Sequence, residues 1–115
     1  MEHTVSLKEN RQFRRLYAKG KTVAGPYLAI YCRRNGAKES RLGITVSGKL
    51  GNAVVRNKLR RRLREAYRTH ETQYVAGYDI VVVARRKAVF GRYTELVRDL
   101  LRLSRKLNLI REETP

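Results

Sequence analysis

The sequence predicts an α+β domain, because strand-like and helix-like periodicities occur in the same short chain. Residues 27–33 and 41–47 alternate apolar and polar side chains, as expected of strands with one buried face. Residues 79–84 are almost continuously apolar, which is typical of a central strand. Helical periodicity recurs in three segments, 7–19, 52–68 and 93–109. Antiparallel strands with helices on one side of the sheet make an α+β fold, here expected as a single domain over residues 1–115 with a frayed tail at 110–115.

The first helix is predicted by a capping box. Ser6-Leu7-Lys8-Glu9 has the Ser-x-x-Glu pattern that precedes a helix, so we expect the helix to begin at Leu7. Phe13 and Tyr17 then share one helix face by their spacing, and Gly20 is a natural stop.

The first alternating stretch follows an interruption at Gly25-Pro26. This dipeptide predicts a bend or bulge at a sheet edge, and it leaves open whether two or three strands precede the central helix. After it, Leu28, Ile30 and Cys32 point to one face, which we expect to be core. The opposite and less covered face is expected to carry Tyr27, Ala29, Tyr31 and Arg33.

The second alternating stretch is expected to pair with the first. Its apolar residues from Leu42 to Val46 point inward, and Gly43 and Thr45 point outward. Asn35-Gly36 lies between the two stretches and predicts a turn. We therefore expect the two strands to be antiparallel neighbours.

Positive charge is concentrated in the central helical segment, whose residues 49–68 read KLGNAVVRNKLRRRLREAYR. It holds eight Lys or Arg and one acidic residue. Asn52 is the expected N-cap, and an apolar stripe runs along Val55, Leu59, Leu63 and Ala66. The opposite side forms one exposed ridge of Asn57, Lys58, Arg60, Arg61, Arg64 and Arg68. Like charges at this spacing destabilise a helix, so an external anion is expected to neutralise them.

Composition points to the same partner. The 115 residues include 27 Lys or Arg against 10 Asp or Glu, a formal net charge of +17. Such a charge favours a polyanionic partner, nucleic acid first and an anionic membrane surface second. The apolar fraction of 42% is that of a folded domain and not of a disordered basic tail.

Several classes of protein are excluded or disfavoured. No apolar run has the length of a membrane span or of a signal peptide. Cys32 is the single cysteine, so no internal disulfide can form, and with only His3 and His70 a zinc cluster is not expected. We therefore expect a reduced, cytoplasmic protein in which Cys32 is a core thiol.

No active site is evident in the sequence. The ten acidic residues are scattered; Glu65 is expected to pair with neighbouring arginines and Asp79 to serve a turn. His70 lies near a helix end, where a cation is favoured. There is no glycine-rich phosphate loop, although Gly48 to Gly51 could form an anion-binding turn. The residues indicate a nucleic-acid-binding module without chemistry of its own.

The basic segment resembles a known signature. GNAVVRNKLRRRLREAYR, preceded by RLGITVSGKL, is similar to the RNR motif of the bacterial ribonuclease P protein component, Gly-Asn-Ala-Val-x-Arg-Asn-Arg-x-(Lys/Arg)-Arg-x-x-Arg. The resemblance extends to LKENRQFRRLYAKG, to Ala84–Lys87 and to the last helix. It implies a fold like the second domain of ribosomal protein S5: helix, three strands, basic helix, strand, helix. It also implies a left-handed crossover through the basic helix.

The resemblance further implies a function. The family's protein pairs with a catalytic RNA that removes the 5′ leader from precursor tRNA, and the chemistry resides in that RNA and its Mg²⁺. The expected partners are therefore the ribonuclease P RNA and precursor tRNA, with no cofactor on the protein and one monomer per RNA. Two rival readings remain open: a ribosomal protein or RNA chaperone, and a stand-alone nuclease with acids gathered from distant segments.

The resemblance also implies two sets of binding residues. The expected contacts to the RNA subunit are Lys49, Asn52, Arg56, Asn57, Lys58, Arg60, Arg61, Arg64 and Arg68. Lys58 stands where the family usually has Arg, which keeps the charge but loses the bidentate fork. Gly48 stands where many members have Lys, so the resemblance does not extend to that basic contact. The expected leader-binding residues are Phe13, Tyr17, Tyr31, Thr45, Arg86 and Lys87.

The aromatic residues of the second set have an alternative reading as core. Phe13 is the one that core packing suits best, whereas Tyr31 alternates away from Leu28 and Ile30. We expect Tyr31 to project together with Tyr27 and Ala29, and the small outward residues Gly43 and Thr45 to leave room for a single RNA strand to lie flat.

Overall fold

A mixed five-stranded sheet organises the chain, and the computed structural model describes residues 1–111 of it. Along the sheet the strands run in the order β1-β4-β5-β3-β2. Their bounds are β1 Thr4–Ser6, β2 Lys21–Ala24, β3 Leu28–Arg34, β4 Ser40–Thr45 and β5 Tyr78–Ala84. The α-helices are α1 Asn10–Lys19, α2 Ala53–His70 and α3 Tyr93–Lys106. The expected α+β class is confirmed.

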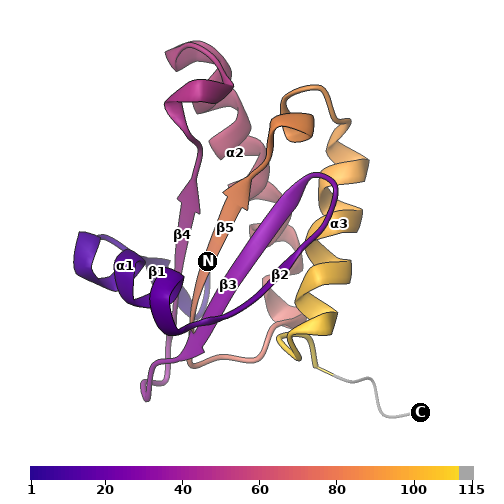
Figure 1. Ribbon diagram of the computed structural model, residues 1–115. Coiled ribbons are helices and arrows are strands. Elements are labelled where there is room, and N and C mark those ends of the chain that lie inside the picture. The colour runs from indigo at the N-terminus through magenta and orange to yellow at the C-terminus, as the bar shows by residue number, and fades with distance from the viewer. Residues whose placement is uncertain (112–115) are drawn as a thin grey trace.

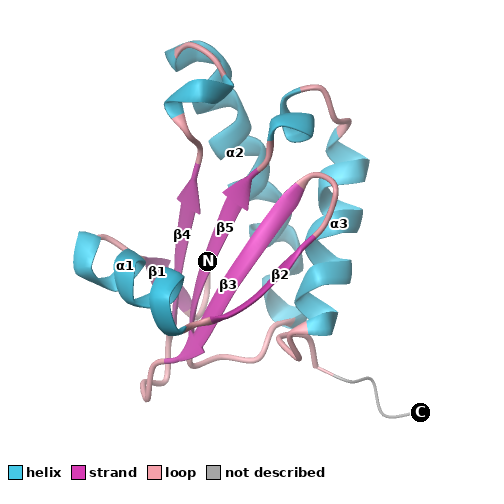
Figure 2. Ribbon diagram, in the orientation of Figure 1, coloured by secondary structure: helices cyan, strands magenta, loops and turns pink. Residues whose placement is uncertain are grey.

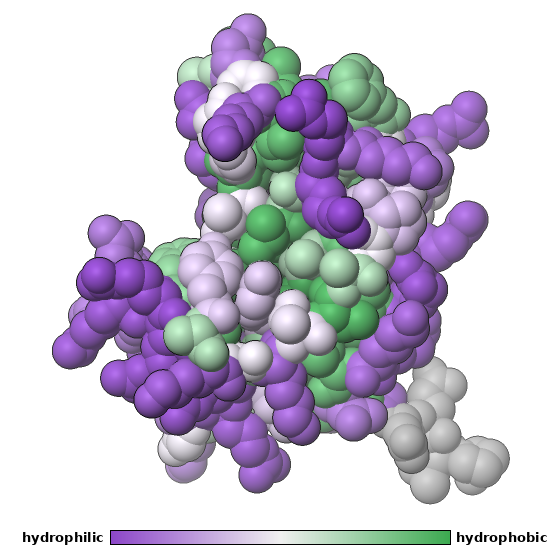
Figure 3. Space-filling model, in the orientation of Figure 1, coloured by the Kyte–Doolittle hydropathy of each residue, from purple (hydrophilic) through white to green (hydrophobic). Residues whose placement is uncertain are grey.

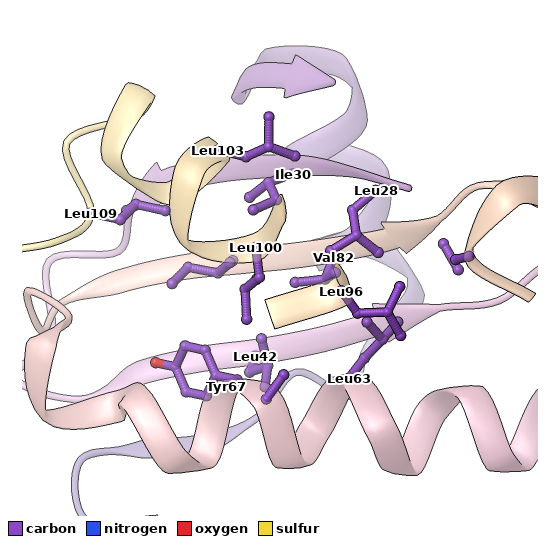
Figure 4. Close-up of a cluster of buried hydrophobic side chains, with 14 of the residues drawn as sticks. Leu28, Ile30, Leu42, Leu63, Tyr67, Val82, Leu96, Leu100, Leu103 and Leu109 are labelled. Atoms are coloured by element: carbon purple, nitrogen blue, oxygen red, sulfur yellow. The ribbon is translucent and has the colours of Figure 1, made fainter. Parts of the chain in front are cut away.

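The two faces of the sheet are covered unequally (Figures 1 and 2). Helices α2 and α3 lie together behind the sheet and bury the larger core. Figure 4 shows Leu28, Ile30 and Val82 of the sheet meeting Leu63 of α2 and Leu100 of α3. Helix α1 crosses the other face and covers only part of it. The smaller core beneath α1 has Leu7, Leu16 and Val81 buried, with Phe13, Tyr31 and Val83 packed against them.

The crossover through α2 is left-handed, as the resemblance implied. Strands β4 and β5 are parallel neighbours, and α2 connects them. In Figure 1 both strands point upward, β5 lies to the right of β4, and α2 runs behind the sheet. This hand is the reverse of the one that nearly all such connections adopt.

The expected pairing of the two alternating strands is wrong. Strand β5 lies between β3 and β4, with Val82 opposite Ile30 on the antiparallel side and opposite Ile44 on the parallel side. Strand β5 is apolar on both faces, so burial favours it at the centre of the sheet, where α1 and the two other helices cover it from both sides.

The first helix begins at Asn10 and not at Leu7. Glu9 is the N-cap, and its capping box is closed by Gln12, whose Oε1 accepts the Glu9 N–H at 3.3 Å. Ser6, the expected cap, lies in β1, a strand that sequence periodicity missed because it has only three residues. Strand β1 pairs with β4 in parallel, and the Leu7 N–H donates to the Leu42 carbonyl at 2.9 Å. Burial of Leu7 thus accompanies an extra strand at the sheet edge.

Two further boundaries are the split at Gly25-Pro26, which the sequence left open, and the end of α3, which differs from the expected one. Gly25-Pro26 does split the segment, so three strands, β2 to β4, stand between α1 and α2. Helix α3 ends at Lys106, three residues early, and the chain turns through Asn108, which has a φ of 58°.

The described part of the expected tail is bonded to residues 73–74. Ile110 forms a bridge with Tyr74, and the Arg111 N–H donates to the Gln73 carbonyl at 2.7 Å, so these two residues are held. Residues 112–115 of that expectation lie outside the described residues. Within residues 1–111, no helix is both long and apolar enough to cross a membrane.

Candidate RNA interface

Helix α2 is positioned by its cap and its apolar stripe. The Asn52 side-chain oxygen accepts the Val55 N–H at 3.0 Å, which confirms the predicted N-cap. Leu59, Leu63 and Ala66 are buried as predicted, whereas Val55 is only half-buried. Burial of this stripe against the sheet and α3 fixes which side of the helix faces outward.

The outward side carries the predicted charge. We call the exposed residues Asn57, Lys58, Arg61, Arg64 and Arg68 the basic ridge. Arg68 is paired with Glu65, whose carboxylate accepts the Arg68 Nε–H at 2.9 Å. That hydrogen bond lowers the pKa of Glu65. Among residues 1–111, no ion pair engages Lys58, Arg61 or Arg64.

The remaining arginines of α2 are less available than the sequence suggested. Arg60 is half-buried and donates to the Asn57 side chain at 3.0 Å. Arg62 donates to the Gly91 carbonyl at 3.0 Å, which ties α2 to the start of α3. Arg56 is half-buried, and its Nε is buried without a partner. Because that Nε is buried, it is not accessible to an incoming phosphate in this conformation.

A groove runs along the ridge. It has a volume of about 850 Å³ and is lined by Met1, Lys58, Arg61, Arg62, Arg64, Glu65, Arg68 and Tyr93. Five of these side chains are cationic and one is acidic. A groove of this charge suits a polyanionic backbone, because Lys and Arg neutralise phosphates and release their counterions.

A second candidate surface lies on the opposite face of the sheet, beside α1. We call Phe13, Tyr17, Tyr31 and Thr45 the aromatic cleft. The rings of Tyr17 and Tyr31 are 5.0 Å apart between centroids and nearly perpendicular, at 82°. The Tyr17 hydroxyl lies 2.7 Å from the Thr45 hydroxyl. In Figure 3 the sheet surface here is pale to green and recessed between purple, hydrophilic side chains. Four residues from α1, β3 and β4 are thus brought together as predicted.

The role expected for Gly43 is wrong. Gly43 is buried, and a Cβ atom added to it would lie 2.6 Å from the Phe13 ring. The missing side chain therefore makes room for Phe13 and not for RNA. Phe13 is half-buried in the small core under α1, so it supports one wall of the cleft while exposing part of its ring.

Tyr27 does not project with Tyr31. It precedes the first residue of β3, and its N–H donates to Asp99 of α3 at 3.0 Å. Its hydroxyl donates to Glu95, also on α3. These bonds hold Tyr27 against the larger core, on the other side of the sheet from the cleft.

The two basic residues expected beside the leader are exposed, and at least Lys87 is directed elsewhere. Arg86 and Lys87 lie in a 3₁₀ turn, Arg86–Val89, that follows β5. The Lys87 Nζ is 5.1 Å from the centre of the Tyr27 ring, so Lys87 lies beside Tyr27 and not beside Tyr31. Lys49 lies exposed in a 3₁₀ turn before α2, where the Ser47 side chain accepts its N–H at 3.2 Å.

The two buried acidic residues, Asp99 and Glu71, serve the fold. Buried Asp99 accepts the N–H groups of Tyr27 and Leu28, at 3.0 Å each, and pairs with Arg102 at 2.8 Å. Buried Glu71 accepts the Glu2 N–H at 2.7 Å. Burial alone would raise the pKa of Glu71, but hydrogen bonds from Thr4, Glu2 and His3 lower it overall. Sequence reasoning missed both; only Asp99 gave a signal, as a polar residue within the leucine stripe of α3.

The side chains that could bind a metal are dispersed in the described part of the chain. No three His, Cys, Asp or Glu side chains within residues 1–111 gather where they could hold an ion. The Cys32 thiol is buried, and burial raises its pKa, as expected of a core residue.

A small, strongly basic α+β domain with an exposed cationic helix belongs to the class of nucleic-acid-binding proteins. The family model described as Ribonuclease P matches residues 1–108, and the chain therefore belongs to the ribonuclease P protein family. Membership of this family assigns the chain to the ribonuclease P complex, which has an RNA partner and functions in tRNA processing.

Relatives and solved structures agree with the family. The "Ribonuclease P protein component" of Alkaliphilus oremlandii is 41% identical over 104 residues, which cover 90% of this chain and 91% of the relative. The Staphylococcus aureus RNase P protein superposes with a TM-score of 0.84 at 34% identity, covering 95% of this chain and 98% of that one. The Thermotoga maritima protein gives 0.80 at 35% identity, covering 87% and 96%.

Proposed function

We propose that this chain is the subunit that assists a catalytic RNA in removing the 5′ leader of precursor tRNA. In this proposal the basic ridge binds the RNA subunit and the aromatic cleft binds the single-stranded leader. The observation that carries the proposal is that α2, which bears the ridge, and α1, which borders the cleft, lie on opposite faces of one sheet (Figure 1). Two RNA segments can then be held at once without competing for the same side chains.

The chemistry of the cleft suits unpaired bases. Tyr17 is 41% exposed, and its contact with Tyr31 holds two rings at a fixed angle. Aromatic faces stack on bases of any sequence, at about 1–3 kcal/mol per base. A recess between a helix and a sheet excludes a duplex, so a single strand fits it better.

The chemistry of the ridge suits a phosphate backbone. Lys58, Arg61 and Arg64 have no acidic partner within residues 1–111, so their charges are available to phosphates. The half-buried Arg56 adds a further positive charge near the start of the same helix. Phosphate contacts fix register and orientation, which is what a subunit bound to a large RNA requires.

The cleavage itself is proposed to occur on the RNA. The acids of the described chain that are most buried, Glu71 and Asp99, are consumed by structural hydrogen bonds. Mg²⁺ that promotes hydrolysis would then be held by RNA phosphates, and the protein's part is to bind and orient.

A cleavage assay tests the proposal. The purified protein, freed of contaminating RNA, should not cleave precursor tRNA, and adding the catalytic RNA should restore cleavage at the mature 5′ end. Site-specific, Mg²⁺-dependent cleavage by the protein alone would overturn the proposal in favour of a stand-alone nuclease.

Binding separates the proposal from a general RNA chaperone. The holoenzyme should bind precursor tRNA more tightly than mature tRNA, and the difference should depend on the leader. Equal affinities would leave the aromatic cleft without a function and would favour a chaperone or ribosomal protein.

A further inference from the structure

A third group of cations lies on α1, on the side of the helix away from the aromatic cleft. Arg11, Arg15 and Lys19 are all exposed and are spaced four residues apart. Residues at this spacing lie on one side of a helix, about 6 Å apart along its axis. In Figure 3 hydrophilic side chains crowd the lower left, where Figure 1 places α1.

Two hollows connect these residues to the lower end of the sheet. The first, of about 250 Å³, is lined by Arg11, Gln12, Arg15, Leu16, Arg33, Arg41 and Asp79. The second, of about 420 Å³, is lined by Lys19, Lys21, Cys32, Arg33, Arg34, Tyr78, Leu107 and Asn108. Arg33 lines both, so the two hollows form one continuous surface. We call it the α1 basic surface.

The acids at this surface are already neutralised. Asp79 accepts two hydrogen bonds from Arg41, both at 2.7 Å, and a third from Asn35 at 3.1 Å. Glu9, at the start of α1, pairs with Arg11 at 2.7 Å. Five cations of this surface have no ion pair within residues 1–111: Arg15, Lys19, Lys21, Arg33 and Arg34.

Cations greatly outnumber aromatic side chains at this surface. Tyr78 is its one aromatic residue, and the Arg34 guanidinium lies 5.8 Å from the centre of the Tyr78 ring. Guanidinium and ammonium groups around small hollows suit phosphate oxygens, which Arg can bind through two parallel hydrogen bonds. The chemistry therefore favours backbone contacts over reading of sequence.

We propose that the α1 basic surface binds the sugar–phosphate backbone of RNA without sequence preference. It is a third contact surface, beyond the ridge and the cleft, and it uses none of their residues. The phosphates have two possible sources: the RNA subunit, or the part of a precursor that lies beyond the cleft.

A matched pair of triple variants tests the inference. The test variant is Arg15→Gln, Lys19→Gln and Arg33→Gln; the control is Arg98→Gln, Arg105→Gln and Lys106→Gln on α3. All six residues are exposed, and both variants lose three positive charges. Urea unfolding midpoints should stay equal, and the single variant Arg33→Gln provides the same test should the triple variant fail to fold.

The readout is the salt dependence of binding in two arms. One arm uses the catalytic RNA alone, and the other uses the holoenzyme with precursor tRNA carrying a long or a short leader. The log K against log salt slope should fall by roughly 2–3 units for three lost phosphate contacts, and by nearly 1 unit for Arg33→Gln.

A loss in the first arm identifies the RNA subunit as the source, and a loss confined to the long leader identifies the precursor. Either result supports the site. Slopes that match those of the α3 control in both arms would overturn it. Failure here leaves the proposed function standing, because the ridge and the cleft are intact in both variants.

Discussion

The basic ridge on α2 and the aromatic cleft beside α1 lie on opposite faces of one sheet and are built differently. The ridge presents charged side chains that are exposed, and three of them have no ion pair within residues 1–111. The cleft presents side chains that hold each other, through the Tyr17–Tyr31 contact and the Tyr17–Thr45 hydrogen bond. A ridge of this kind can adapt to a partner, whereas a cleft of this kind is already ordered before binding.

The difference originates in how each sheet face is covered. Helices α2 and α3 cover one face, so a binding surface on that side must lie on the outer sides of the helices. Helix α1 alone lies on the other face and leaves part of the sheet open (Figure 2). The exposed side of a helix can carry charge even where the sheet face beneath it is fully covered. A recess for unpaired bases needs a sheet face that is only partly covered. The two surfaces should therefore respond differently to salt and to substitution.

The largest expected effect comes from removing ridge charge. Replacing Lys58, Arg61 and Arg64 by Gln should lower the log K against log salt slope for the RNA subunit by roughly 2–3 units. The affinity at 0.1 M salt should then fall by roughly 10²–10³-fold, taking 1 M salt as the reference. Fluorescence titrations over a salt series measure both quantities.

The α3 variant with Arg98, Arg105 and Lys106 replaced by Gln controls for net charge, and it should lose much less. A ridge variant with an unchanged slope and an intact circular dichroism spectrum would move the main RNA contact away from α2.

A smaller and salt-independent effect is expected in the cleft. Replacing Tyr31 by Ala removes a stacking ring and should weaken holoenzyme binding of precursor tRNA by roughly 5- to 100-fold. Mature tRNA, which has no leader, should bind as before. Phe90→Ala is the control, because Phe90 is an 84% exposed aromatic residue that is not part of the cleft. Equal losses for both tRNAs would assign Tyr31 to the fold or to the RNA subunit.

The smallest effect concerns the support of the cleft wall. Gly43→Ala places a Cβ atom 2.6 Å from the Phe13 ring, so α1 must shift. The free energy of unfolding should fall by about 1 kcal/mol, the low end of overpacking, because the clashing atoms lie at the tip of the side chain. Urea denaturation should show a lower midpoint at an unchanged slope.

Gly48→Ala serves as the comparison, since no atom lies within 4 Å of its added Cβ. Ridge affinity should be unchanged in both glycine variants. If Gly43→Ala is as stable as Gly48→Ala, Phe13 is not packed on Gly43 and the cleft wall is looser than described.

Much of the ridge could be predicted because it depends on one helix. The cap at Asn52 and the buried side chains of Leu59 and Leu63 follow from spacing within a few turns. Once those residues face the core, Arg61 and Arg64 must face outward. The availability of each arginine could not be predicted in the same way: Arg62 reaches the Gly91 carbonyl, 29 residues away.

The cleft could be predicted only in part. The alternation that buries Ile30 correctly turned Tyr31 to the opposite face, since side chains in a strand alternate. Tyr27 broke the pattern because it lies before the strand and is held by Asp99, 72 residues away. The contact between Phe13 and Gly43 joins α1 to β4, which are separated in the chain by β2 and β3. No local sequence pattern reports such a contact.

The sequence by itself determined the α+β class, the apolar side of each main element, and the charged outer side of α2. These properties depend on periodicities of two or 3.6 residues, which act within a single element. Tertiary structure decided that β5 separates β3 from β4, that β1 extends the sheet, and that α1 leaves a recess on one side and gathers cations on the other. The physical reason is that periodicity specifies which side of an element is apolar. Which elements share that buried surface is decided by the burial of the whole chain.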